Sequence, residues 1–377
     1  MRLGLLDMFV PSEDDRAAPA QSAAIGLEPS PTTVGLQAWR TALAPALAAR
    51  RIAAACPLAL RASFLLAIGV YLLAFGASIA TGIRAPILDG VPLCLGPTAF
   101  FWAYCLIAFP RARRMRLFIE AVFVVVALGL GLACLSYLGA AAAFPLRDPQ
   151  MIWVDRHMGF DWLAIMVSLD RRSIALDVLD GAYATFTFQL LATAFVLVLA
   201  KRRRDLDRFF VTFVCASLIA EAASVIVPTV GPMSVLAASA DFVHLHTLGR
   251  TTAEIVLRLR DGALREIDLD AVNGIICFPS LHAAVAVIVP FTLRWNRPLF
   301  CAVVVLDSAM FISAVPSGNH YFADVLGGVT VAAAAIAVSG PIQGSLARLM
   351  RTTVLSVRNV VIVEWANRAD GRACPRV

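Results

Sequence analysis

A proline, a serine and a histidine open an apolar segment in the C-terminal half of the chain, in the order Pro279, Ser280 and His282. Proline suits the first turn of a helix, because an N–H at that position has no intrahelical partner to lose. The first N–H groups of a helix are free to bind phosphate. We therefore expect a helix that begins here and presents His282 near an anionic group.

His320 and Asp324 stand four residues apart, where a later apolar segment opens. This spacing places two side chains on one face of a helix, so the carboxylate can hydrogen-bond one imidazole nitrogen. The other nitrogen is then presented as a nucleophile. Either histidine alone is more often structural than catalytic. Two histidines at one membrane face, however, match the needs of phosphoryl transfer through a phosphohistidine.

These residues resemble the motifs of the phosphatidic acid phosphatase type 2 superfamily, whose second motif reads P-S-x-H and whose third reads S-R-x-x-x-x-x-H-x-x-x-D. By that resemblance His320 attacks phosphorus, Asp324 orients it, and His282 protonates the leaving oxygen as a general acid. Ser280 would hydrogen-bond a phosphate oxygen. The other residues predicted to bind substrate are Gly318, Asn319, Tyr321 and Gly231.

Two departures from the family pattern concern the phosphate clamp. Ala314 follows Ser313 where the third motif has its arginine, and no K-x-x-x-x-x-x-R-P first motif is present. Phosphoryl transfer depends on positioning and on electrostatic stabilisation of the transition state, so another cation is needed. Arg250 and Arg258 are candidates, although a solvated arginine that faces headgroups is the more common case.

Without that arginine, the segment from His320 to Asp324 resembles the branch that contains inositol phosphorylceramide synthase and related inositolphosphotransferases. The stretch Pro228-Thr229-Val230-Gly231-Pro232 is similar to a proline-rich stretch of that branch. The branch favours transfer of a headgroup, whereas water at an exposed pocket favours hydrolysis. Both outcomes remain open at this point.

The composition indicates that a membrane holds these residues. Apolar residues make up 60% of the 377 residues and charged residues 15%, which leaves too little polar surface to cover a soluble globule. Apolar runs of roughly 17 to 22 residues are each long enough to cross a hydrocarbon core about 30 Å thick. We predict an all-α polytopic membrane bundle of about eight transmembrane helices with a six-helix phosphatase-type core. The predicted spans are residues 64–80, 91–109, 117–138, 182–200, 209–227, 275–293, 299–315 and 321–338.

Basic clusters give the predicted orientation. The clusters comprise residues 50–51, 111–116, 201–204, 294 with 297, and 348 with 351. If the chain has about eight spans, all of these clusters fall on one side of the membrane. The positive-inside rule assigns that side to the cytoplasm. Both termini are then cytoplasmic, and the loops 139–181 and 228–274 lie outside with the histidine motifs. We expect a bacterial inner (plasma) membrane and a periplasmic or extracellular active site. Residues 151–162 mix aromatic and charged side chains as a headgroup-level helix would.

We therefore expect the chain to consist of a flexible or interfacial cytoplasmic tail (1–60), a transmembrane catalytic domain (61–345) and a C-terminal cytoplasmic tail (346–377). The net charge of +6 is explained by the loop arginines rather than by binding to nucleic acid. The eight cysteines are scattered and show no metal-like spacing, so we predict neither a metal nor another cofactor.

The leading hypothesis is a lipid phosphatase or phosphotransferase that acts on a phospholipid or isoprenoid phosphoester drawn from the surrounding membrane lipids. A transporter or flippase is the alternative of another class. It would explain Glu221 and Asp307 within apolar spans, where a charge costs about 2.5 to 3.5 kcal/mol on insertion scales. It would not explain two histidine motifs at a common face.

Overall fold

The computed structural model describes residues 58–85, 113–237, 242–245, 248–268, 272–316 and 320–369. Within these ranges the regular structure is helical, with one isolated bridge between Arg84 and Glu266. The predicted all-α class is therefore confirmed. The predicted span at 91–109 and the N-terminal residues before 58 lie outside the described part of the chain.

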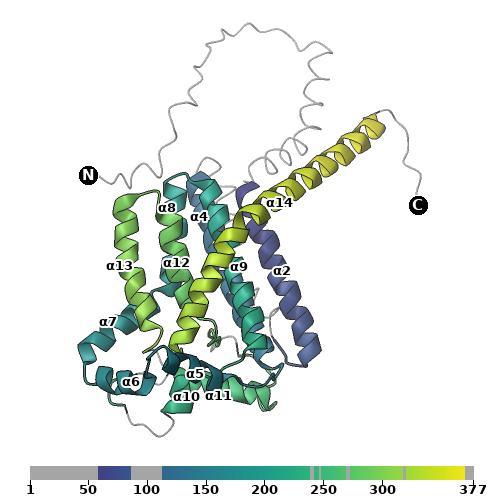
Figure 1. The fold of residues 1–377 in the computed structure, drawn as a ribbon. Coiled ribbons are helices and arrows are strands. Elements are labelled where there is room, and N and C mark those ends of the chain that lie inside the picture. Colours follow the sequence, from purple (N-terminus) through teal and green to yellow (C-terminus); the bar gives the residue numbers. More distant parts are fainter. Residues whose placement is uncertain are drawn as a thin grey trace, which may run out of the picture.

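Long apolar helices run side by side and form the bundle seen in Figure 1. The central helix is α9, because it packs against α2, α4, α8, α12 and α14. Most of these helices are apolar on several faces, as expected when one face meets other helices and the opposite face meets lipid. Their bounds are α2 Leu58–Thr81, α4 Arg113–Ala140, α8 Phe186–Leu199, α9 Arg203–Ile226, α12 Leu281–Leu293, α13 Arg297–Ser313 and α14 Phe322–Ala369.

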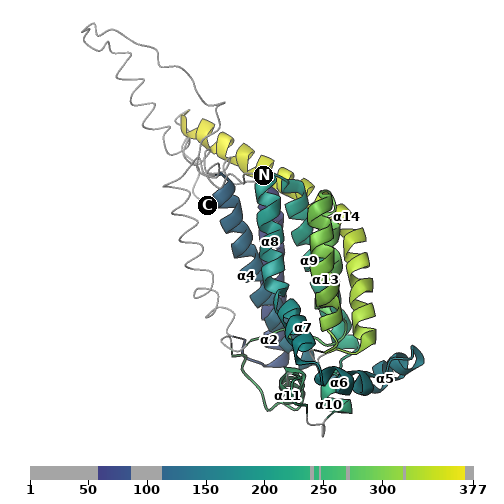
Figure 2. The same cartoon turned by 90° about the vertical axis from the view of Figure 1, so that its left-hand side faces the viewer.

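Short helices gather at one end of this bundle, as the two perpendicular views in Figures 1 and 2 show. They come from the two loops that the sequence predicts outside the membrane. Their bounds are α5 Asp148–His157, α6 Trp162–Asp170, α7 Ser173–Ala184, α10 Pro232–Leu236 and α11 Leu248–Arg260. The predicted headgroup-level helix at 151–162 is thus divided between α5 and α6.

Three described helical segments are long and apolar enough to cross a membrane singly: Leu117–Ala140, Arg203–Ile226 and Phe322–Arg348. The pair α7 and α8 makes a fourth if the two helices form one bent span. Leu65–Thr81 and Leu281–Leu293 are shorter apolar helices. Three to four described segments therefore qualify as spans, and the count of eight stays a prediction.

Two predicted spans differ from the helices that form. The span predicted at 182–200 is bent by 50° between α7 and α8. At the bend, the Thr185 hydroxyl donates to the Ala182 carbonyl oxygen at 2.6 Å and so competes with the helical hydrogen bonds. The span predicted at 275–293 becomes helical only at Leu281, because Pro279 disfavours helical geometry in the preceding residue and Ser280 caps the helix.

The basic clusters meet at the end of the bundle opposite the short helices. The Arg202 guanidinium lies 4.6 Å from the centre of the Trp295 ring, which joins the α8–α9 turn to the α12–α13 turn. The Gln343 amide of α14 donates to the Arg204 carbonyl oxygen at 2.9 Å. Three clusters that lie far apart in the sequence therefore share one end.

The last helix, α14, is longer than a membrane span. It continues through the start of the predicted C-terminal tail as far as Ala369 and leaves the bundle on the way (Figure 1). Pro341 lies inside the helix and cannot donate a backbone hydrogen bond, which is a common cause of bending. The first turn of α14 is the part that bears on the candidate active site.

Candidate active site

His282 stands in the first turn of α12, at the end of the bundle where the short helices lie. Ser280 is the N-cap of this helix, and its buried hydroxyl accepts a hydrogen bond from the Ala283 N–H at 3.3 Å. The imidazole of His282 stacks on the Tyr183 ring at 3.8 Å between centroids and 12° between planes. The Phe186 ring lies 4.6 Å away at a tilt. The α7–α8 junction therefore fixes the plane of His282.

His320 lies just before α14 and is 2% exposed. Its Nδ1 atom is 2.8 Å from the carbonyl oxygen of Cys277. A carbonyl oxygen can only accept a hydrogen bond, so Nδ1 carries the proton and Nε2 keeps its lone pair. Ser280, two residues before His282, hydrogen-bonds the backbone of Asp324, so the structure brings the segments of the two predicted histidines together.

Asp324 is fully buried in the first turn of α14, one helical turn after His320. Its Oδ2 atom lies 3.6 Å from His320 Nδ1, which is an ion-pair distance rather than a hydrogen bond. The same oxygen accepts a hydrogen bond from the Tyr321 N–H at 2.8 Å. The expected hydrogen bond from imidazole to carboxylate is thus replaced by one to the Cys277 carbonyl, and Asp324 acts on the imidazole through its charge.

Two glycines allow α14 to approach the segment that carries His282. A Cβ atom on Gly328 would lie 2.3 Å from the Ser280 carbonyl oxygen and 2.9 Å from the Ala283 Cβ. A Cβ atom on Gly327 would lie 2.9 Å from the Phe278 ring. The Ser280 N–H also donates to the Asp324 carbonyl oxygen at 2.9 Å. Small residues therefore hold the starts of α12 and α14 against each other.

Asp155 of α5 holds the first turn of α14, a role that the sequence did not indicate. Its carboxylate accepts hydrogen bonds from the Phe322 N–H at 2.9 Å and the Ala323 N–H at 2.8 Å. These N–H groups belong to the start of a helix and have no intrahelical partners. Burial raises the pKa of the Asp155 carboxyl, although both hydrogen bonds favour the ionised form. Asp155 thereby positions the turn that carries His320 and Asp324.

Asp148, also of α5, connects Tyr321 to the proline-rich stretch. It accepts hydrogen bonds from the Tyr321 hydroxyl at 3.0 Å, the Gly231 N–H at 3.0 Å and the Val230 N–H at 3.1 Å. Gly231 has a φ of 94°, which side-chain-bearing residues rarely adopt. The Tyr321 hydroxyl is fully buried and donates to Asp148. Tyr321 and Gly231 are therefore anchored here, and their contact with substrate stays a prediction.

The remaining candidates are Gly318, Asn319, Arg250 and Arg258. Gly318 and Asn319 fall outside the described residues. Arg250 donates to the Ala237 carbonyl oxygen at 3.0 Å, and Arg258 is exposed on α11. Among the described residues, no three His, Cys, Asp or Glu side chains come together as metal ligands would.

Comparison with family models gives a match to the PAP2 superfamily over residues 149–338. This region contains His282, His320 and Asp324, as well as Asp155. Comparison with curated proteins and with solved structures gives no match. The matched region covers half of the chain and contains helices that are long and apolar enough to cross a membrane. The chain therefore belongs to the PAP2 superfamily, whose members are phosphatase-type phosphoesterases, and is an integral membrane protein.

Proposed function

We propose that the chain transfers the phosphoryl group of a membrane lipid phosphoester through a phosphohistidine on His320. The observation that carries this proposal is the hydrogen bond from His320 Nδ1 to the Cys277 carbonyl. It leaves the Nε2 lone pair for phosphorus, while His282 stands nearby on another helix. The substrate class is a phospholipid or an isoprenoid phosphoester, because the site lies at one end of an apolar bundle.

The proposed reaction has two steps. In the first, His320 Nε2 bonds to phosphorus as the bond to the leaving oxygen breaks, and His282 in its protonated form gives that oxygen a proton. Asp324 stabilises the positive charge that develops on the His320 ring. In the second step, neutral His282 takes a proton from water or from an acceptor hydroxyl, whose oxygen attacks phosphorus and releases His320.

Water or a hydroxyl compound can resolve the intermediate, so hydrolysis and headgroup transfer share the first step. The resemblance to the inositol phosphorylceramide synthase branch supports transfer to or from a polyol. A phosphatase remains the simpler form of the same activity, and we propose hydrolysis or transfer with the same three side chains in the same roles.

We propose further that about eight spans around a six-helix phosphatase-type core place both termini in the cytoplasm. The site would then face the periplasm or the exterior of a bacterial inner membrane. Support comes from the basic clusters around Arg202, Arg204 and Trp295, which share one end of the bundle. The histidines occupy the other end. The positive-inside rule assigns the basic end to the cytoplasm.

Lipid mass spectrometry of the purified protein tests this function. The substrates are phosphatidate, a polyprenyl diphosphate and an inositol lipid, each incubated in ¹⁸O-labelled water with a polyol as acceptor. Release of ¹⁸O-containing phosphate identifies hydrolysis, and an exchanged headgroup without label identifies transfer. An unchanged lipid pool with all three substrates, or turnover that survives the change His320→Asn, would contradict the proposal.

A further inference from the structure

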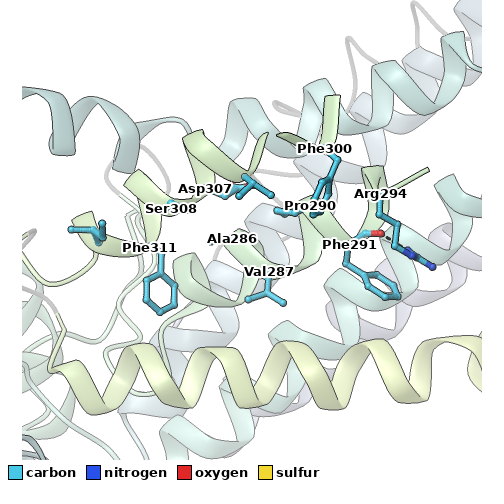
Figure 3. Close-up of a pocket in the computed structure, with 11 residues that line it drawn as sticks. Ala286, Val287, Pro290, Phe291, Arg294, Phe300, Asp307, Ser308 and Phe311 are labelled. Atoms are coloured by element: carbon cyan, nitrogen blue, oxygen red, sulfur yellow. Dashed lines mark hydrogen bonds between the residues drawn. The ribbon is translucent and has the colours of Figure 1, made fainter. Parts of the chain in front are cut away.

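A cleft of about 690 Å³ lies between α12 and α13. Its walls are mainly apolar, and Figure 3 shows side chains from both helices along it. A space of this size is in the range of pockets that hold a small organic ligand. The apolar side chains that line it include Ala286, Val287 and Phe291 of α12 and Val304 and Phe311 of α13.

The cleft is in register with the candidate active site. Ala286, Pro290 and Arg294 line it at intervals of four residues, and His282 is the preceding member of that series. These positions share one face of α12. The lined face extends over eight residues, or roughly 12 Å, at 1.5 Å per residue. The cleft therefore begins one turn from His282 and runs away from it along the bundle.

Arg294 lines the end of the cleft that is farther from His282. The Arg294 guanidinium lies 3.7 Å from the centre of the Phe291 ring and donates to the Phe291 carbonyl oxygen (Figure 3). Arg294 belongs to the basic end of the bundle. The orientation of an occupant therefore follows from the register with His282: a phosphate that reacts beside the histidines leaves the apolar part between the helices, with its end toward Arg294.

Asp307 also reaches the cleft from α13, yet it does not make the site polar. Its side chain is 2% exposed, and neither carboxyl oxygen has a hydrogen-bond partner among the described residues. Because the Asp307 side chain is almost fully covered, the surface left to an occupant is mainly hydrocarbon.

We propose that this cleft binds the hydrocarbon chain of the phosphoester whose phosphate reacts between His282 and His320. Binding along the chain would hold the phosphate in place and favour long-chain substrates over short ones. The inference rests on the proposed function for the identity of the headgroup. Beyond that function, the proposal states which part of the protein selects the hydrocarbon chain of the substrate: the cleft between α12 and α13.

Two neighbouring valines provide a matched test. Val304 lines the cleft, whereas Val305 is 73% exposed on another face of α13. We expect Val304→Trp to fill the cleft and lower kcat/KM for a long-chain lipid phosphate by at least about tenfold, as the loss of an apolar pocket does. Activity on water-soluble phenyl phosphate should stay within about twofold, because that substrate has no chain to place. Val305→Trp should leave both activities unchanged.

The exposed Ser308 also lines the cleft, so Ser308→Phe repeats the test with a change that does not crowd the core. An equal loss with both substrates in the two cleft variants, or no loss with the long-chain substrate, would overturn the proposal. Failure of the proposed function itself is recognised separately, because the wild-type protein would then turn over neither substrate.

A binding measurement makes the test independent of turnover. A long-chain alkyl phosphate with a diazirine near the chain end is photo-crosslinked to the protein in detergent micelles, and the labelled peptides are mapped by mass spectrometry. We expect label on residues 286–312 in the wild type and in Val305→Trp, and loss of that label in Val304→Trp. Label confined to other helices would overturn the proposal even if the enzyme were active.

Discussion

A backbone carbonyl sets the protonation of the proposed nucleophile. The Cys277 carbonyl oxygen holds His320 Nδ1 at 2.8 Å, and the Asp324 carboxylate stands 3.6 Å from the same nitrogen. The carbonyl fixes the tautomer and the ring orientation, while the carboxylate supplies negative charge. His282 is held differently, by two aromatic rings, Tyr183 and Phe186. The two histidines are thus equipped for different tasks.

Removal of His282, the proposed general acid, should produce a defect that depends on the leaving group. We expect His282→Asn to lower kcat on an alkyl phosphate by roughly 10²–10⁴-fold, the usual contribution of general acid catalysis. p-Nitrophenyl phosphate should be hydrolysed at close to the wild-type rate, because its departing oxygen scarcely needs a proton. Steady-state kinetics with a series of phosphomonoesters checks this. Equal losses across the series would show that His282 is not the acid.

Loss of the Asp324 charge should slow the reaction and leave the fold in place. In Asp324→Asn the side-chain oxygen can still accept the Tyr321 N–H, but the negative charge beside the His320 ring is removed. We expect kcat to fall by roughly 10²-fold, as for other lost electrostatic contributions, with little change in KM. Expression and thermal stability serve as controls. Wild-type kcat in this variant would remove Asp324 from the mechanism.

The starts of α12 and α14 form one unit, which α5 holds from outside the bundle. Asp155 binds the first N–H groups of α14, and Asp148 binds Tyr321. Gly327 and Gly328 let α14 lie directly on the residues that precede His282. The geometry of the site therefore depends on contacts between these elements as much as on the three side chains themselves.

A methyl group at Gly328 should separate the two helix starts. Gly328→Ala places a Cβ atom against the Ser280 carbonyl, and overpacking of this kind destabilises by about 1–3 kcal/mol. A shift of about 1 Å can lower activity about 10²-fold. Gly344→Ala is the matched control, because a Cβ atom on Gly344 meets nothing within 4 Å. Thermal unfolding and kcat/KM are compared for both variants, and equal behaviour of the two would contradict the packing argument.

The candidate site was predicted from residues that carry a motif. The spacing of Ser280 with His282 and of His320 with Asp324 predicted one site, and the Ser280 N–H donates to the Asp324 carbonyl oxygen, so the two motif segments lie against each other. The Cys277 carbonyl carries no side-chain signature, so it could not be anticipated. Asp155 is 167 residues from the N–H it binds, and such a long-range cap has no local pattern. The adjacent glycines at 327–328 were a readable signal of close helix packing.

Two predicted spans differ from the helices that form, for physical reasons. Hydropathy measures composition, so it extended a span through residues 275–280, where Pro279 and the capping Ser280 delay the helix to Leu281. It also treated 182–200 as one segment, although Thr185 marks a 50° bend. Hydrogen bonds and helix caps decide these boundaries, and a hydropathy average does not detect them.

At the scale of the whole molecule, the basic end and the histidine end should lie on opposite sides of the membrane. In a variant whose native cysteines are replaced by alanine, Met158→Cys tests α5 and Arg204→Cys tests the basic end; both native side chains are exposed. We expect an impermeant maleimide to label position 158 in intact cells. Position 204 should react only after the membrane is opened. The reverse pattern would invert the orientation.

Detection of a phosphoenzyme tests the central claim most directly. The purified protein is mixed with a ³²P-labelled lipid phosphate and quenched in alkali, which preserves phosphohistidine. We expect covalent label in the wild type and in the control variant His157→Asn. In the native protein, His157 Nδ1 also lies 2.8 Å from a carbonyl oxygen, but this histidine is exposed and lies outside the site. His320→Asn should carry no label. Label of wild-type amount in His320→Asn, or its absence from a wild-type protein that turns over under the same conditions, would contradict His320 as the nucleophile.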